Sequence, residues 1–184
     1  MRALEHDLPA GLVFGQEDFA VGALTDGPDD PELVEQLVDV VTQTYRWFIE
    51  AWARRVGFDD GADGLTSHWG FYVRGKIMLR NDTTILLRPE HYQRFVRPYD
   101  ERLLTAFGGA IHFCGKADQL FDAMLSTGGL TAVNSSQPDL NDNQRFFRLA
   151  RQLGLVVLGW PREMTPAGVN TGLSYDRDHP EGRV

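Results

Sequence analysis

The stretch GAIHFCGKADQLFDAMLSTGGLTAVNSSQPDLNDNQRFFRLARQLGLVVL, residues 109–158, decides the fold class. Three apolar runs in it are typical of buried strands, namely Ala110–Cys114, Leu130–Asn134 and Leu155–Leu158. Between them, Lys116–Ser126 and Asn141–Leu153 have the apolar spacing of helices. Short loops join these elements, so the stretch predicts βαβ units and a parallel sheet.

The residues before this stretch predict further helices and a strand. Asp30 is an N-cap acid before the first-turn proline Pro31, and the helix that begins there is expected to run to about residue 56. A strand is expected near Leu65–His68, and a short one is conceivable at residues 12–14. A second helix is expected from Pro89 to about residue 107, with a kink at Pro98.

Composition restricts the class of protein. The 184 residues fit a single domain, 1–184, in which the Gly- and Pro-rich residues 161–184 are predicted to form an irregular tail. The net charge of −8 argues against a nucleic-acid partner. No run of about 18 apolar residues suggests a membrane span, and the first residues do not resemble a signal peptide. We therefore expect a cytoplasmic protein with no membrane partner.

His112 and Cys114 form the sharpest local motif. Residues i and i+2 of a strand point to the same side, so the imidazole and the thiol should project together. Both are zinc ligands, but a catalytic zinc needs three protein ligands and one open position. The third would be His68, an Asp or Glu, or a residue outside this chain. Alternatively, Cys114 packs as a small hydrophobe beside a hydrogen-bonded His112, which the spacing alone favours.

Other polar residues lie where ligands bind in parallel α/β folds, at the carboxyl ends of strands. Asp82 and Thr83 could offer a carboxylate and a hydroxyl to a ligand, or could bond the local backbone in a turn. His68 could ligate a metal or transfer a proton, or it could form a half-buried aromatic pair with Trp69. Asn134 opens a polar loop that could bind carboxylates or simply cap the next helix. No P-loop, G-x-S-x-G, G-x-G-x-x-G or H-E-x-x-H motif is present.

Two segments resemble a known family. LRNDTTILLRPEHYQRFVRPY, residues 79–99, resembles a signature of the uroporphyrinogen decarboxylase superfamily, and GGAIHFCG, residues 108–115, resembles its G-G-x-I-H-x-C-G motif. The similarity continues through residues 130–134, 137–138 and 140–142, includes the earlier helix start at residues 30–34, and covers about residues 12–160. It implies a partial (β/α)₈ TIM barrel, made of approximately the last four to five βα units.

The resemblance implies three possible functions. The first is a carboxy-lyase that removes carboxyl groups from a tetrapyrrole-like substrate, as in porphyrin biosynthesis, without a cofactor. The resemblance identifies no catalytic residue in this sequence. The substrate-binding residues would be Asp82, Thr83, His68, His112 and Asn134. The second is a zinc-dependent corrinoid or thiol methyltransferase, whose His-x-Cys ligands match His112 and Cys114 but whose second cysteine is missing. The third is an inactive, truncated or split-barrel subunit.

A partial barrel also implies a partner besides a small-molecule substrate. Half a barrel exposes a sheet edge on each side, and exposed edges are a liability unless another chain covers them. We therefore expect either a homodimer or a separate chain that supplies the N-terminal half of the barrel.

Overall fold

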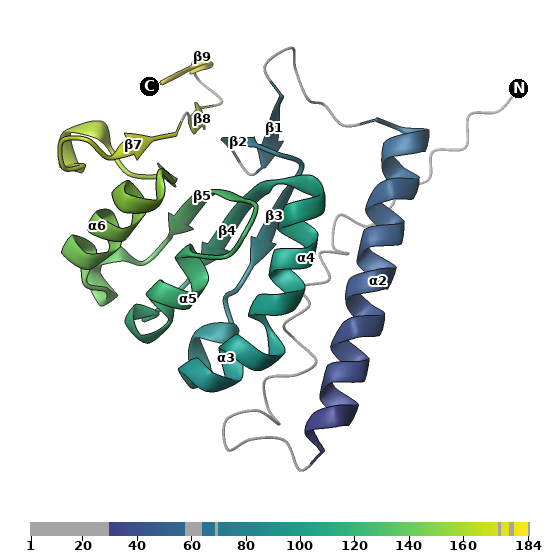
Figure 1. Ribbon diagram of the computed structural model, residues 1–184. Coiled ribbons are helices and arrows are strands. Elements are labelled where there is room, and N and C mark those ends of the chain that lie inside the picture. Colours follow the sequence, from purple (N-terminus) through teal and green to yellow (C-terminus); the bar gives the residue numbers. More distant parts are fainter. Residues whose placement is uncertain (1–29, 58–63, 69, 173, 177–178, 184) are drawn as a thin grey trace, which may run out of the picture.

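The computed structural model describes residues 30–57, 64–68, 70–172, 174–176 and 179–183. Its centre is a five-stranded parallel sheet with the strand order β3-β4-β5-β6-β7 (Figure 1). The bounds are β3 Ile77–Arg80, β4 Gly109–Phe113, β5 Leu130–Ser135, β6 Val156–Leu158 and β7 Asn170–Thr171. The predicted α/β class and parallel sheet are confirmed, and each strand lies beside the next one along the chain.

Helices connect the strands of the sheet in the predicted way. They are α3 Pro89–Phe95 and α4 Arg97–Phe107 after β3, α5 Phe121–Leu125 after β4, and α6 Asn143–Leu153 after β5. The helix expected around Pro98 is two helices, because the chain leaves the helical conformation at Val96, where φ is −121°. Pro98 then lies in the first turn of α4, where its missing N–H costs nothing.

The helices cover one face of the sheet. Alternate strand residues, among them Ile111, Phe113 and Val133, are buried in one core with residues of α4, α5 and α6. The other face presents Ala110, Ala132 and Leu158 to Val73, and a hairpin of β1 Leu65–His68 and β2 Phe71–Arg74 supplies that cover. The strand predicted at 65–68 is therefore confirmed, whereas the one considered at 12–14 lies outside the described residues.

The last part of the chain differs from its predicted irregular course. It contains β7, which pairs with β6, and also β8 Ser174–Asp176 and β9 His179–Arg183, which pair with each other. The outer edge of β6 has backbone groups that need partners, and a two-residue strand satisfies some of them. The composition of residues 161–184 predicts turns. The pairing of the two-residue strand β7 depends instead on the edge of β6, which local composition does not describe.

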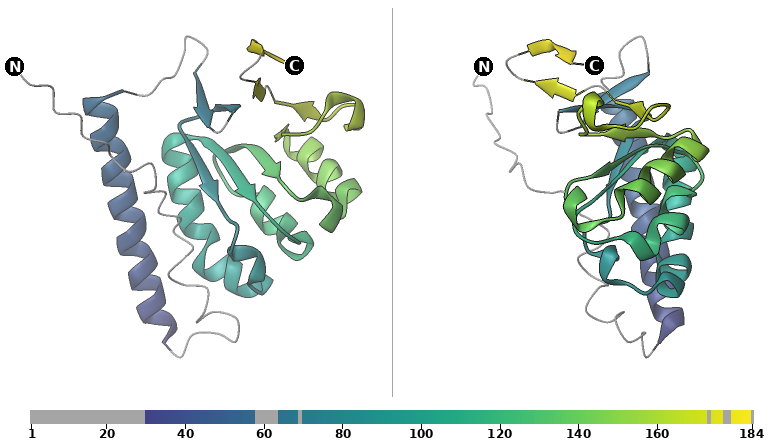
Figure 2. Two further views of the ribbon diagram at one scale, coloured as in Figure 1. Left: turned by 180° about the vertical axis from the view of Figure 1, so that it is seen from behind. Right: turned by 90° about the vertical axis from the view of Figure 1, so that its left-hand side faces the viewer.

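The sequence predicts the long helix α2 Pro31–Arg55 correctly: it begins after Asp30 as expected, and it ends one residue before the predicted position 56. Asp30 Oδ1 accepts a hydrogen bond from the Leu33 amide at 3.0 Å, which is the expected N-cap contact. The helix runs along the outside of α4 (Figures 1 and 2). Within the described part of the chain, no helix has the length and apolar character needed to cross a membrane.

A buried polar cluster joins the end of β3 to α3 and α4. Asn81 Nδ2 donates to Asp100 Oδ2 at 2.8 Å and lies 3.3 Å from the Tyr92 hydroxyl oxygen. All three residues are buried. Burial raises the pKa of Asp100 to about 7, although hydrogen bonds from Asn81 and Tyr92 oppose the shift. Asn81 and Tyr92, which belong to the segment 79–99, are therefore part of the buried core of this fold.

The raised pKa of Asp100 predicts how stability depends on pH. Between about pH 4 and pH 7 the folded state binds a proton that the unfolded state has lost, so the free energy of unfolding falls as pH rises. The loss is about 4 kcal/mol across this window, at about 1.4 kcal/mol per pKa unit. We expect Asp100→Asn to flatten the curve, measured by urea unfolding at several pH values. Asp139→Asn, at an exposed position, is the control, and an unchanged slope in Asp100→Asn would contradict the prediction.

Candidate functional site

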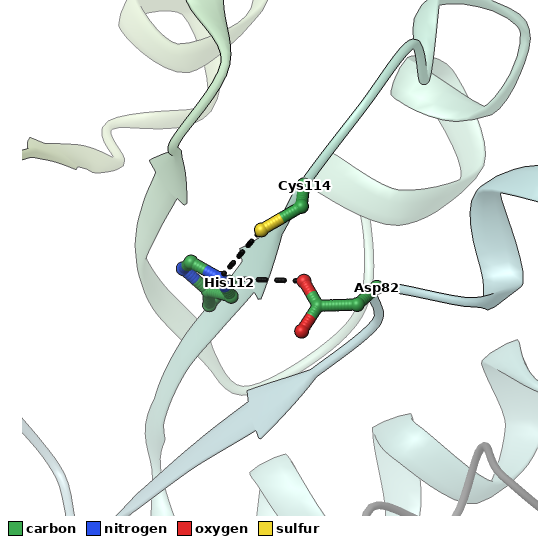
Figure 3. A group of neighbouring side chains, drawn as sticks. All are labelled: Asp82, His112 and Cys114. Carbon is green, nitrogen blue, oxygen red and sulfur yellow. Dashed lines mark hydrogen bonds and ion pairs between the residues drawn. The ribbon is translucent and has the colours of Figure 1, made fainter.

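The carboxyl ends of the neighbouring strands β3 and β4 bring three polar side chains together. His112 lies in β4 on the face turned away from the helices, since its neighbours Ile111 and Phe113 belong to the helix-side core. Cys114 follows β4 directly, and Asp82 follows β3 after one residue. Figure 3 shows the carboxylate and the sulfur both directed at the His112 ring.

The distances within this cluster are short. His112 Nε2 lies 3.3 Å from Asp82 Oδ1 and 3.3 Å from Cys114 Sγ. The ligand atoms of all three residues lie within 4.8 Å of one another. The His112 side chain is only 7% exposed, whereas that of Asp82 is 35% exposed, so the cluster is at the boundary between core and solvent. We call these three residues the three-donor cluster.

Asn134 determines which nitrogen of His112 faces the cluster. Its Nδ2 donates to the Leu158 carbonyl at 2.8 Å, which leaves Oδ1 to face His112 Nδ1 at 2.5 Å. An amide oxygen can only accept, so Nδ1 must carry the proton. In the neutral ring Nε2 then presents its lone pair to Asp82 and Cys114.

This arrangement directs three electron-pair donors at one point. Asp82 Oδ1 is buried and, among the described residues, accepts no hydrogen bond, although Nε2 is 3.3 Å away. An imidazole lone pair and a carboxylate oxygen repel each other at that distance unless a proton or a cation lies between them. Metal-bound histidines commonly have this arrangement, in which the other ring N–H donates to an oxygen that fixes the ring.

The residue types and two of the separations in the cluster are compatible with a zinc ion. Two ligands of a tetrahedral zinc, each about 2.0–2.3 Å from the metal, lie about 3.3–3.8 Å apart. The two separations of 3.3 Å from His112 Nε2 are at the lower end of this range. Three protein ligands drawn from His, Cys and a carboxylate, with one position left over, are the pattern of a catalytic zinc rather than a structural one.

The Cys114 thiol is held in its protonated form in this environment. Burial raises its pKa most, and the carboxylate of Asp82 raises it further, while Ser136 and the more distant positive charge of Arg80 oppose the shift. Ser136 Oγ lies 2.8 Å from Cys114 Sγ. A thiolate is therefore not expected here without an added positive charge. A nucleophilic cysteine, by contrast, has a lowered pKa and is a thiolate at neutral pH.

A pocket of about 460 Å³ opens beside the cluster. Its polar side is formed by residues of β4 and β5, including His112, Asn134 and Ser135, and its apolar side by Phe71 and Trp160 together with Pro138, Pro161 and Met164. Ser135 Oγ and Trp160 Nε1 are buried, with no hydrogen-bond partner in the described ranges. Both groups could therefore bind a polar atom of a ligand.

The predicted site residues fall into two groups. Asp82, His112, Cys114 and Asn134 come together. His68 does not: its ring hydrogen-bonds the backbone of Lys76, just before β3, whereas Asp82 follows the other end of that strand. Burial lowers the pKa of His68. Thr83 lies outside the three-donor cluster, in the turn that leads into the short 3₁₀ segment Thr84–Leu86.

Three residues at or near the site were not predicted from the sequence. Phe71 and Met164 line the pocket, and Arg80 lies in β3 directly opposite His112. Phe71 reaches the pocket from the β1–β2 hairpin, which covers the face of the sheet opposite the helices, and Met164 reaches it from the short 3₁₀ segment Arg162–Met164. The position of Arg80 follows from the register of the parallel sheet, which the sequence does not specify.

Comparison with known proteins adds no relative: no protein-family model, curated protein or solved structure matches this chain. The class of protein is therefore defined by the fold and the site alone. It is an α/β protein with a cluster of three metal-ligand side chains and a pocket at the carboxyl end of a parallel sheet.

Proposed function

We propose that this chain is a zinc-dependent enzyme, or a subunit of one, that transfers a methyl group to or from a small thiol. Asp82, His112 and Cys114 would hold the ion. The observation that carries the proposal is the contact between Asn134 Oδ1 and His112 Nδ1, which assigns the proton to Nδ1 and leaves Nε2 to face the other two donors.

The residues of the chain have separate roles in this proposal. A zinc ion in the cluster would supply a Lewis acid that binds a substrate thiol in the open position and favours its thiolate. His112 and Cys114 hold the ion from one strand, and Asp82 holds it from the next. Asn134 is a positioning residue, because it acts only through the His112 ring.

The pocket suits a small substrate. Its volume of about 460 Å³ lies in the lower half of the range of about 300–1,000 Å³ for small-molecule sites. The ring of Trp160, packed against Phe147 with centroids 4.8 Å apart, gives the apolar wall a fixed position. The apolar wall would cover the body of the substrate, and Ser135 Oγ would bind one of its polar atoms.

A methyl-transfer assay tests the function. The full chain, loaded with zinc, is mixed with methylcobalamin and a small thiol such as 2-mercaptoethanol, and the absorbance change of cobalamin demethylation is followed. We expect a rate that requires both zinc and thiol and that Cys114→Ala abolishes. Zinc binding at the cluster without any zinc-dependent demethylation would contradict the methyl-transfer proposal.

Replacing Asn134 tests the proposed orientation of His112. We expect Asn134→Leu to weaken zinc binding by about 10- to 100-fold, the usual effect of removing a partner that orients a metal ligand. Asn134→Asp keeps an oxygen that accepts from Nδ1 and should retain most of the affinity. Competition with a chromophoric chelator measures both variants. Equal losses in the two variants would contradict a role through His112.

Decarboxylation of a carboxylated tetrapyrrole-like substrate is a second candidate function. It is favoured by Arg80, whose partner in the sheet register is His112 and whose positive charge acts on Cys114, so a substrate carboxylate would have a cation near the three-donor cluster. Asp82, Thr83, His112 and Asn134 would then contact the substrate. Turnover of uroporphyrinogen in the presence of a metal chelator would support this function over methyl transfer.

The fold supports a partial (β/α)₈ barrel as the framework. In such a barrel each strand lies beside the next in sequence and the helices cover only the outer face. The order β3-β4-β5-β6-β7, and the single helix-covered face, agree with that arrangement. A second chain that supplies the remaining strands would complete the barrel. An inactive split-barrel subunit is the third candidate, and the absence of both demethylation and decarboxylation by the chain alone would favour it.

A further inference from the structure

Helix α2 has an inner side that is fixed to the rest of the molecule. Val34, Tyr45 and Ile49 pack on the main core. The Tyr99 hydroxyl donates to the Glu35 carbonyl at 3.1 Å. Arg94 pairs with the Glu35 carboxylate at 2.6 Å, and Arg102 pairs with Asp39 at 2.5 Å. These contacts determine which sides of α2 are left to face outward.

The same helix exposes a second apolar side. The large apolar side chains on it are between 46% and 66% exposed: Leu33, Leu37, Val40, Trp47, Phe48, Trp52 and Val56. At about 100° per residue, Leu33, Leu37, Val40, Trp47 and Phe48 lie within about 100° of one another and form one stripe, whereas Trp52 and Val56 turn toward the inner side. We call these five residues the α2 stripe. A tryptophan and a phenylalanine in one exposed stripe are typical of an interaction surface.

Charge is distributed unevenly along α2. Its N-terminal half carries Glu32, Glu35 and Asp39 and no basic residue. Its C-terminal half carries Arg46, Arg54 and Arg55, with Glu50 as the one acid. The helix dipole adds only about half a charge of the opposite sign at each end, which reduces this asymmetry without cancelling it, so an antiparallel neighbour is still favoured.

We propose that the α2 stripe is the interface between two copies of this chain, with the two α2 helices antiparallel about a twofold axis. Glu32 at the acidic end of each helix then lies near Arg54 at the basic end of the other, while Glu35 and Asp39 stay paired with Arg94 and Arg102 of their own chain. A parallel arrangement would bring like charges together. The proposal concerns a different surface from the sheet edges, and it does not depend on the proposed function.

Glu32 and Arg54 are the pair that this geometry brings together. They are separated by 22 residues, about six full helical turns, so they lie on nearly the same side at opposite ends of α2. An antiparallel twofold places Glu32 of one copy beside Arg54 of the other, twice per dimer. Both side chains are exposed, and within the described ranges neither has a salt-bridge partner.

Sedimentation equilibrium of the full chain tests the proposal. We expect a reversible dimer in wild type and an association at least about 100-fold weaker in Trp47→Glu, which puts a charge into the stripe close to the middle of α2. Glu32→Arg and Arg54→Glu should each weaken association roughly three- to tenfold, because each creates two like-charge contacts. The double variant Glu32→Arg/Arg54→Glu should recover the wild-type value. Arg148→Glu, on the exposed side of α6, is the matched control.

Each remaining outcome overturns the proposal. A wild-type monomer at 100 μM would mean that residues 1–29 or another protein covers the stripe. A dimer unaffected by Trp47→Glu would place the contact elsewhere, for example at the sheet edges. Failure of the double variant to recover association would contradict the antiparallel arrangement. Far-UV circular dichroism of every variant excludes loss of the fold as the cause.

Discussion

Cys114→Ala is expected to lower the affinity for zinc by at least about 100-fold, because it removes one of three protein ligands and leaves a weak two-ligand site. His112→Ala should have an effect of the same order, since Nε2 is the donor shared by both short contacts. Competition with a chromophoric chelator measures the affinity of each variant. The binding should also weaken toward low pH, where protons compete for all three ligands.

Asp82→Asn and Asp139→Asn form the matched pair of controls for this result. Both remove a carboxylate charge, but only Asp82 belongs to the three-donor cluster. Zinc binding should fall in Asp82→Asn and stay unchanged in Asp139→Asn. Equal affinity in wild type and Asp82→Asn would mean that the third ligand is elsewhere, and equal affinity in wild type and Cys114→Ala would remove the site altogether.

Phe146→Ala is expected to be the most destabilising single substitution in the core. Phe146 is 1% exposed and lies among Phe113, Phe121 and Phe147, with ring centroids 5.5 to 6.2 Å away. Truncation to alanine should lower the free energy of unfolding by about 3–5 kcal/mol, since a cavity replaces a ring that touches three others. That is a large share of the about 5–15 kcal/mol that a domain has in total.

Urea unfolding of Phe146→Ala and Arg148→Ala measures this effect on the same helix. Arg148 is exposed, so its replacement should change the free energy of unfolding by no more than about 0.5 kcal/mol. A loss below about 1.5 kcal/mol in Phe146→Ala would indicate that the aromatic cluster repacks around the gap. The sheet would then be less rigidly held against α5 and α6 than the ring contacts imply.

The parallel sheet could be predicted because its strands are buried on both faces. Such strands have continuous apolar runs, and those at residues 110–114, 130–134 and 155–158 were each confirmed within two residues of their ends. The helix predicted at 116–126 is shorter, with α5 at Phe121–Leu125 after a 3₁₀ turn. Here the Asn141 side chain accepts from the Ala117 amide and donates to the Gly115 carbonyl, a distant contact that local propensity does not contain.

The site could be predicted only where it is local in sequence. His112 and Cys114 share a side because a strand has a period of two, and this needs no knowledge of the neighbouring strands. The choice of Asp82 over His68 as the third donor depends on the order and register of the parallel strands. Asn134 was proposed as a ligand-binding residue, but its contact with His112 arises from the pairing of β4 with β5.

X-ray absorption at the zinc edge of the protein, purified without a metal-affinity tag, tests the central claim most directly. The account predicts about one zinc per chain, with a single sulfur ligand at about 2.3 Å and nitrogen or oxygen ligands at about 2.0–2.2 Å, and loss of the sulfur signal in Cys114→Ser. A zinc bound by oxygen and nitrogen alone, or a wild-type protein that takes up no zinc, would contradict it.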